Sequence, residues 1–405
     1  MKNGWQTKTL GEVLEVLRNG VNCKQNKNGK GDRISRIESI SYATFDLGKV
    51  GFADLSERDK ERYQLRKGDI LFSHINSAVH VGKTAVFESD EPVYHGVNLL
   101  LMRPKDTVTA RFLDYTLKFL FVNGYWRGIC KQSVNQASVN QQDISKVEFR
   151  YPQSLPEQRR IVGILDEAFA GIATAKAHAE KNLQNARALF ESHLNAVFTQ
   201  RGEGWNDKPL ETVAAIINGY AFKSGDFSST KGVKCIKITN VGIREFVPEA
   251  NESLPAHFAD EYSAVSVKEG SIVLALTRTI ISGGLKVAVV PSDFDGALLN
   301  QRVASILAKS DKLMASFLFF YFCTEQVVDY VLDRVNTLMQ PNLSIRDLRA
   351  MPIPAPSLRD QERITRQLSL LRDEKKRIES IYQRKLAALD ELKKSLLHQA
   401  FSGQL

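Results

Sequence analysis

The sequence predicts an α+β protein in which two similar globular domains are joined by two long helices packed as an antiparallel coiled coil. Three observations support this prediction. The chain has 405 residues, which is too long for one comfortable core and suits two or three domains. Its second half repeats the motif order of its first half at an offset of roughly 200 residues. Each half ends in a run that reads as one helix of roughly 43 residues, about 65 Å long, far beyond the needs of a single domain.

We place the first globular domain at residues 1–152. It begins with Trp5 and Thr9–Val13 and continues into a polar loop rich in Asn and Gly. Such a loop with basic side chains can follow a phosphate backbone, or it can be a solvated surface loop. Both interpretations stay open for its basic residues, which are Lys24, Lys27, Lys30, Arg33 and Arg36.

The middle of this domain predicts a sheet with polar side chains beside it. Lys67–Ser73 predicts a turn and a short buried strand, Val97–Met102 a buried strand, and Phe112–Leu120 an amphipathic helix. Gly82–Thr84 is similar to the end of a phosphate loop, but position 77 is Ser where the motif needs Gly, so we reject nucleotide binding there. Polar candidates for DNA contact follow the first strand or stand near the end of the domain: His74, Asn76, His80, Lys83, Gln136 and Ser138.

The first long helix lies in the segment 153–203. Pro156 stands in the first turn, where its missing N–H costs nothing, and Glu157 complements the positive end of the helix. An apolar seam recurs about every 3.6 residues, which suits a nearly straight helix with one buried face. The seam consists of Ile161, Leu165, Ala168, Ile172, Ala175, Ala179, Leu183, Ala186, Phe190, Leu194 and Val197.

The second globular domain, at residues 204–356, repeats the first in order. Trp205 and Leu210 restart the pattern, Lys268–Leu274 predicts the turn and strand, and Phe317–Phe322 predicts the helix. The candidates for DNA contact in this half are Lys223, Lys231, Lys234, Lys237, Thr277, Arg278, Thr279, Lys286, Gln340 and Asn342. For the candidates of both domains, a surface or turn-capping role stays open as the alternative.

The second long helix lies in the segment 357–405. Its seam is rich in Leu where the first is rich in Ala, and small residues facing large ones allow close approach, so we expect the helices to pack antiparallel. The alternative is that each helix packs only on its own domain. The second seam consists of Ile364, Leu368, Leu371, Ile378, Tyr382, Leu386, Leu389 and Leu396, with Lys375 as a polar interruption.

Composition narrows the class of protein. The formal net charge is +9, with 23 basic and 17 acidic residues in 1–152 but 15 and 16 in 204–356. This charge fits an anionic partner, and a solvated basic surface is the alternative. We expect a cytoplasmic protein, because no basic-then-apolar leader and no membrane-length apolar run is present. Four widely spaced cysteines, without Cys-x-x-Cys pairs or His at ligand spacing, predict reduced, mostly buried thiols: Cys23, Cys130, Cys235 and Cys323.

Five segments of the chain carry short motifs: Lys67–Ser73, Leu155–Arg159, Gln340–Ser344, Pro352–Pro354 and Ala400–Gly403. Each motif is modest alone, but their order, duplication and attachment to two long helices are specific to one family. On these residues, and over essentially its whole length, the chain resembles the specificity subunit of type I restriction-modification systems, the HsdS family.

The resemblance implies two target recognition domains, 1–152 and 204–356, that each read one half of a bipartite double-stranded DNA site. It implies that the helices of 153–203 and 357–405 act as a spacer and dock two methyltransferase subunits, which restriction and translocase subunits join. It also implies a non-catalytic chain, with S-adenosylmethionine bound by the methyltransferase subunit. The sequence agrees, because it contains no Asn-Pro-Pro-aromatic motif, no glycine-rich cofactor loop and no metal-ligand cluster.

The chain departs from the family pattern at the expected contact positions. His74 and Asn76 stand where many members carry an Arg-Thr-Gly-like turn, and Ser271 replaces the counterpart of Asp69. The DNA target therefore does not transfer from the resemblance. Two other classes compete with a specificity subunit: a coiled-coil scaffold whose DNA contact is indifferent to sequence, and an enzyme acting alone.

Overall fold

The computed structural model describes residues 4–26, 28–40, 44–133, 136–249, 252–282, 284–335, 342–402 and 404. The chain divides into two compact units: unit 1 comprises Met1–Glu180 with Gln383–Leu405, and unit 2 comprises Lys181–Tyr382. Each unit contains part of helix α6 (Leu155–Thr199) and part of helix α12 (Leu358–Ser402). The two predicted long helices are thus confirmed, whereas the proposed division at residues 152, 203 and 356 stays a prediction.

The centre of unit 1 is a four-stranded antiparallel sheet with the strand order β2-β8-β5-β7. A two-stranded pair, β1 with β11, joins the beginning and the end of the globular part. A three-stranded sheet, β6-β10-β9, carries several of the predicted contact residues. The strands are β1 (Trp5–Thr9), β2 (Leu14–Asn19), β3 (Asp32–Ile34), β4 (Gly51–Ala53), β5 (Ile70–Phe72), β6 (Ile75–Asn76), β7 (Thr84–Val86), β8 (Leu100–Pro104), β9 (Lys131–Ser133), β10 (Gln136–Ser138) and β11 (Glu148–Pro152).

Short helices surround the sheets of unit 1. Ser56 and Asn140 cap the starts of α2 and α5, because their side-chain oxygens accept hydrogen bonds from the backbone N–H groups of Asp59 and Asp143. The helices are α1 (Leu10–Val13), α2 (Glu57–Tyr63), α3 (Ala110–Val122), α4 (Tyr125–Ile129) and α5 (Gln141–Ser145). Helix α3 contains the predicted helix 112–120.

Unit 2 repeats this topology. Its four-stranded sheet has the order β13-β20-β15-β18, and β12 pairs with β21 as β1 pairs with β11. Its elements are β12 (Asn206–Pro209), α7 (Leu210–Val213), β13 (Ala214–Asn218), β14 (Cys235–Ile236), α8 (Phe258–Glu261), β15 (Ile272–Ala275), β16 (Ile280–Ile281), β17 (Gly284–Leu285), β18 (Val287–Val289), β19 (Leu298–Leu299), β20 (Val303–Ala308), α9 (Ala315–Phe322), α10 (Glu325–Leu332), α11 (Ile345–Ala350) and β21 (Pro352–Ala355). The predicted duplication is therefore confirmed at the level of strand order.

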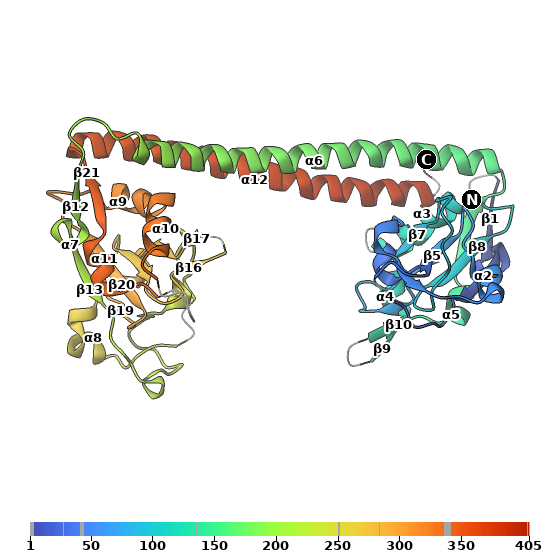
Figure 1. Ribbon diagram of the computed structural model, residues 1–405, viewed down its shortest axis with the longest axis horizontal. Helices are drawn as coiled ribbons and strands as arrows, with labels where there is room; N and C mark the ends of the chain where they lie inside the picture. Colours follow the sequence, from blue (N-terminus) through green and yellow to red (C-terminus); the bar gives the residue numbers. More distant parts are fainter. Residues whose placement is uncertain are drawn as a thin grey trace. The chain divides into compact units, whose positions relative to one another are not determined.

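The long helices complete the core of each unit and lie side by side there (Figure 1). In unit 1 the start of α6, with Ile161, packs in one core with the end of α12, with Leu397. In unit 2 the end of α6, with Phe198, shares a core with Leu368 from the start of α12. Since early residues of one helix meet late residues of the other in both units, the pairing is antiparallel, as predicted.

Polar contacts between the two helices support the same pairing within each unit. Lys176 Nζ lies 2.7 Å from an oxygen of Asp390 in unit 1. In unit 2, Arg187 Nε lies 2.7 Å from an oxygen of Glu379, and Asn182 donates to the Tyr382 hydroxyl at 3.0 Å. Exposed ion pairs of this kind contribute little stability, so the apolar seam carries the pairing.

The seam prediction holds for α6 and fails at one position of α12. Every predicted seam residue of α6 is buried or half-buried, but Leu371 of α12 is 39% exposed. The inward position after Leu368 is instead four residues on, at Arg372, whose guanidinium lies 5.4 Å from the ring centroid of Phe320. The predicted interruption at Lys375 is present, with its Nζ 4.9 Å from the Phe190 ring centroid.

A buried glutamine joins the start of each long helix to the globular part of its unit. Gln158 is 0% exposed, accepts from the Thr109 N–H at 2.8 Å, and donates to the carbonyls of Thr107 and Pro152. Gln361 repeats this in unit 2 with the Met314 N–H at 2.8 Å and two carbonyls. These clamps fix the direction in which each helix leaves its domain.

The prediction of reduced, mostly buried thiols is confirmed in part. All four thiols are free, but only Cys235 and Cys323 are buried, while Cys23 and Cys130 are half-buried. None of the helices within the described residues combines the length and the apolarity that crossing a membrane requires.

Candidate nucleic-acid interface

Strand pairing brings two groups of predicted contact residues in unit 1 together. Asn76 of β6 pairs with Ala137 of β10, and Ser138 pairs with Ile75. The Val139 N–H donates to the His74 carbonyl at 2.9 Å, which extends the same register by one residue. Predicted contact residues more than 60 positions apart in the sequence therefore lie side by side.

A hollow of about 480 Å³ lies beside this pairing. Half of the side chains that line it are amides, and in the described part of the chain no carboxylate and no Lys or Arg side chain borders it. Two of the amides, Gln141 and Asn19, are hydrogen-bonded to each other across the hollow. The lining residues are Asn19, His74, Ile75, Ser138, Val139, Asn140, Gln141 and Gln142.

His74 lies beneath this hollow as a neutral ring. The side chain is 5% exposed, and burial lowers its pKa to about 4. The ring is therefore uncharged at neutral pH, so it cannot serve as a phosphate-binding cation. His74 was predicted as a contact, and its burial limits it to a supporting position.

The predicted basic loop is only partly available to a ligand. Lys24 and Lys30 are exposed, whereas Arg33 pairs with Glu91 and Arg36 pairs with Glu38. None of these four lines the amide hollow. The fifth member, Lys27, lies outside the described residues.

The turn after β6 rules out the phosphate-loop interpretation on structural grounds. Gly82 has a φ of +93°, and a Cβ there would lie 2.2 Å from the Trp126 ring, so this glycine serves packing. Thr84 points inward and donates to Asp114 at 2.6 Å. His80 is exposed and Lys83 half-exposed in the same turn, so both remain candidates for phosphate contact.

The equivalent turn of unit 2 is held in an unusual backbone conformation. Thr277 pairs with Asn342, and the Leu343 N–H donates to the Leu276 carbonyl at 2.9 Å. The next residue, Arg278, is exposed and has a φ of +49°, which is uncommon for a residue with a side chain. Such conformations persist where the surroundings hold them, and they cluster at functional sites.

Thr279 holds this turn from inside, which corrects its prediction as a DNA contact. Its side chain is 0% exposed, and its hydroxyl donates to the Leu276 carbonyl at 3.0 Å. Its own carbonyl accepts from the Lys286 N–H at 2.9 Å. The hydroxyl of Thr279 therefore supports Arg278 and is not available to a ligand.

Three cations gather beside this turn. A hollow of about 330 Å³ is lined by Ile238, Thr239, Thr277, Arg278, Lys286 and Arg302, with no carboxylate among them. Lys286 donates to the Ile238 carbonyl at 2.7 Å, and its pKa is lowered by burial and, less strongly, by the nearby Arg278 charge. The hollow is therefore electropositive, although the domain as a whole has no basic excess.

Arg302 belongs to this group and was not predicted. It is exposed and directly precedes β20, and its carbonyl accepts from the Leu276 N–H at 2.8 Å. A second hollow of about 390 Å³ shares Arg302 and adds Lys237, whose charge is paired with Glu252 at 2.7 Å. The sequence signal for Arg302 was its place at the end of the polar run 300–302, directly before the buried strand β20. That pattern alone does not show that Arg302 faces the turn that contains Arg278.

The other predicted residues of unit 2 lie elsewhere. Lys234 contacts Asp293, with its Nζ 4.4 Å from the Phe294 ring centroid. Lys223 and Lys231 are exposed but line neither hollow, and Asn342 is exposed beside Thr277. Gln340 lies outside the described residues.

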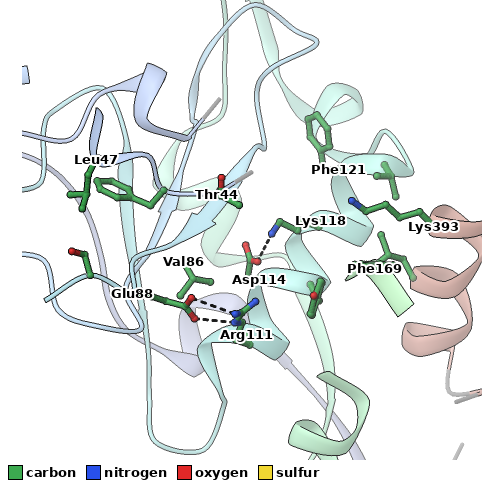
Figure 2. A pocket seen from close by; sticks show the side chains of 15 residues that line it. Thr44, Leu47, Val86, Glu88, Arg111, Asp114, Lys118, Phe121, Phe169 and Lys393 are labelled. Atoms are coloured by element: carbon green, nitrogen blue, oxygen red, sulfur yellow. Dashed lines mark hydrogen bonds and ion pairs between the residues drawn. The ribbon is translucent and has the colours of Figure 1, made fainter. Parts of the chain in front are cut away.

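A larger hollow of about 560 Å³ has a different character (Figure 2). In unit 1 it is bordered by α3, α6 and α12, and its lining includes the aromatic rings of Phe121 and Phe169. Its charged residues are largely paired, as Figure 2 shows for Arg111 with Glu88 and Lys118 with Asp114. Burial and nearby lysines lower the pKa of Lys393, whose Nζ lies 4.9 Å from the Phe169 ring centroid. This apolar hollow is less suited to DNA than the two described above.

Comparison with known proteins connects these surfaces to a family. The model of the type I restriction modification DNA specificity domain matches the chain twice, over residues 2–184 and 202–383. A putative type I restriction enzyme MjaX specificity subunit from Methanocaldococcus jannaschii is 28% identical over 431 aligned positions, which cover 99% of this chain and 93% of that protein.

Two solved structures share the fold over the full length of the chain. One belongs to work on complex assembly and conformational transition of the type I R-M system, with a TM-score of 0.78, 16% identity and coverage of 100% and 99% of the two chains. The other is the HsdS subunit from Thermoanaerobacter tengcongensis, with a TM-score of 0.61, 17% identity and coverage of 100% and 98%. At these identities the likeness establishes the fold.

Proposed function

The chain belongs to the family of type I restriction-modification DNA specificity domains, and from this premise we propose that it is the DNA sequence-specificity subunit of a type I restriction-modification complex. In this role each unit reads one half of a bipartite DNA site. The family model matches twice, once in each half of the chain, which supports two reading modules.

One observation carries this proposal to the level of the site. The two units place a polar hollow beside the same strand pairing, but the hollow of unit 1 is lined by amides and that of unit 2 by cations. Amide and guanidinium side chains recognise different base edges in the major groove. A DNA target with two different halves requires two modules that share a fold but carry different side chains at the equivalent position.

The long helices take the second role in the proposal, as spacer and docking surface. Their outer faces expose large apolar side chains, which a subunit interface would bury. These are Leu189 on α6 and Leu358, Leu370, Leu371, Ile381 and Leu392 on α12, with exposed fractions from 39% to 71%. We assign this face to two methyltransferase subunits, through which restriction and translocase subunits join.

The chemistry of modification belongs, in this proposal, to the partner. The methyltransferase subunit binds S-adenosylmethionine and transfers the methyl group to adenine, while this chain selects the DNA and is not itself catalytic. The complex would act in the cytoplasm, where chromosomal DNA is accessible. The family assignment supports this division of labour.

The proposal is tested by expressing the chain with the methyltransferase subunit of its own system and sequencing the methylated adenines in genomic DNA. We expect methylation confined to sites with two fixed parts separated by a gap of constant length. Methylation without sequence preference, together with strongly salt-dependent binding, would instead support a scaffold protein with sequence-indifferent DNA contact.

A further inference from the structure

The strand register establishes a position-by-position correspondence between the two candidate interfaces. In unit 1, Ser138 pairs with Ile75, and the residue after Ser138 donates to the carbonyl of His74. In unit 2, Asn342 pairs with Thr277, and the residue after Asn342 donates to the carbonyl of Leu276. Ile75 therefore corresponds to Thr277, and the following residues, Asn76 and Arg278, correspond to each other.

This shared position carries different chemistry in the two units. Asn76 presents an amide, with one donor and one acceptor, which matches the N6 and N7 edge of adenine. Arg278 presents a fork of donors, which matches O6 and N7 of guanine. The surroundings differ in the same sense, because amides line the hollow of unit 1 while Lys286 and Arg302 flank Arg278.

Both side chains are held by their local backbone. The Ser77 N–H donates to Asn76 Oδ1 at 2.8 Å, which fixes the amide and leaves the second lone pair of that oxygen and the NH2 group for a ligand. Arg278 stands at the tip of the turn that the buried Thr279 braces, and within the described residues it has neither a hydrogen-bond nor an ion-pair partner. Because the two backbones and the Asn76 amide are already held in place, less conformational freedom is lost on binding, which suits selective recognition.

We propose that Asn76 and Arg278 occupy the same readout position of the two units, so that unit 1 requires an adenine and unit 2 a guanine at that point of their half-sites. Arg302 and Lys286 flank Arg278 as phosphate contacts. This inference rests on the proposed function, because it names the bases that the two surfaces select.

The test uses the complex of the full chain with its methyltransferase subunit. The bipartite site is first read from the methylated adenines, and competition binding then compares duplexes with each of the four base pairs at every half-site position. Wild-type complex should prefer one G·C pair in the half-site of unit 2 by roughly 5- to 150-fold over the other pairs. Arg278→Asn should replace that preference by one for A·T and leave the half-site of unit 1 unchanged.

The reciprocal variant and two controls complete the design. Asn76→Arg should exchange an A·T requirement for G·C in the other half-site alone. Arg278→Lys retains a group that can contact guanine and should keep a weaker G·C preference. Arg349→Asn removes an exposed arginine of α11 that lines neither hollow, and it should leave both half-sites unchanged.

The outcomes separate this inference from the proposed function. If wild-type complex shows no sequence-selective binding, the proposed function itself fails. If it is selective but Arg278→Asn keeps the wild-type G·C preference, or the unit 2 half-site contains no G·C pair, the readout assignment is overturned. If Arg278→Asn abolishes binding to every duplex, Arg278→Lys decides: retained G·C preference supports the assignment, and binding without that preference overturns it.

Discussion

Replacing Gln361 by methionine removes a buried hydrogen-bond clamp while nearly preserving the length of the side chain. Both residues are unbranched and form helices well, so the substitution changes neither helix propensity nor volume by much. What it removes is three contacts: the hydrogen bond from the Met314 N–H at 2.8 Å and those to the carbonyls of Pro356 at 2.9 Å and Lys312 at 3.1 Å.

The size of the effect follows from those contacts. Each neutral hydrogen bond contributes roughly 0.5–1.5 kcal/mol net, and the N–H left without an acceptor adds a desolvation penalty of about 1–3 kcal/mol. Methionine recovers part of this through its apolar contacts. We expect a loss of about 3 kcal/mol in the free energy of unfolding of unit 2, which corresponds to roughly 6–12 °C in Tm for a unit of this size.

Thermal and urea unfolding of the purified chain, followed by circular dichroism, measures this loss. The matched control is Gln367→Met, on the exposed face of the same helix, which should change the free energy of unfolding by less than about 0.5 kcal/mol. The equivalent change in unit 1, Gln158→Met, should cost about as much as Gln361→Met. A loss below about 1 kcal/mol for Gln361→Met would show that the clamp is not what anchors α12.

Three further predictions concern binding, assembly and pH. Arg302→Ala should weaken DNA binding to all sequences and reduce the salt slope of log K by about 0.9, measured by titration at several salt concentrations; Lys309→Ala, at the opposite end of β20, should leave the slope unchanged. Leu370→Asp, at a side chain that is 64% exposed, should weaken assembly with the methyltransferase subunit in analytical ultracentrifugation while the Tm of the free chain stays within about 2 °C. Burial lowers the pKa of His74 from 6.5 to about 4, so its neutral form stabilises unit 1 above pH 6.5 and up to about 3 kcal/mol is lost as pH falls toward 4. His74→Gln should remove the His74 part of this pH dependence and leave the part that comes from the buried His95, whose pKa burial also lowers to about 4. An unchanged pH dependence would contradict the burial of a neutral His74.

The architecture was predictable because it follows from the spacing of apolar residues and from the repetition of motifs between the two halves of the chain. Apolar spacing located α6 and α12 to within a few residues, and the repeated Trp5 and Trp205 signalled two modules of one topology. The one misplaced seam position, Leu371, shows the limit of that method. Which of two neighbouring positions faces inward depends on the globular part beneath the helix, and here Arg372 contacts Phe320.

The candidate site was predictable only in outline. Proximity of Asn76 to Gln136 and Ser138, or of Arg278 to Lys286, depends on strand pairing between distant segments, which local patterns do not specify. Sequence reasoning therefore missed Arg302. It also predicted the buried Thr279 as a contact, because the sequence does not distinguish a hydroxyl that faces a ligand from one that braces a turn from inside. The sequence likewise did not indicate that Arg33 and Lys234 pair with carboxylates of the same chain, Glu91 and Asp293.

The composition of unit 1 from two distant stretches of chain has a consequence for synthesis on the ribosome. Unit 2 is contiguous, so all its residues emerge together, but the core of unit 1 lacks Leu397, Ala400 and Phe401 until translation has passed through the whole of unit 2. Until then the rings of Phe112 and Phe119, which lie 5.4 and 5.5 Å from Phe401, have no cover from α12. Domains usually mature in the order of their synthesis. Here the unit whose synthesis begins first is completed last, so a nascent chain presents a complete unit 1 only after unit 2 has been synthesised.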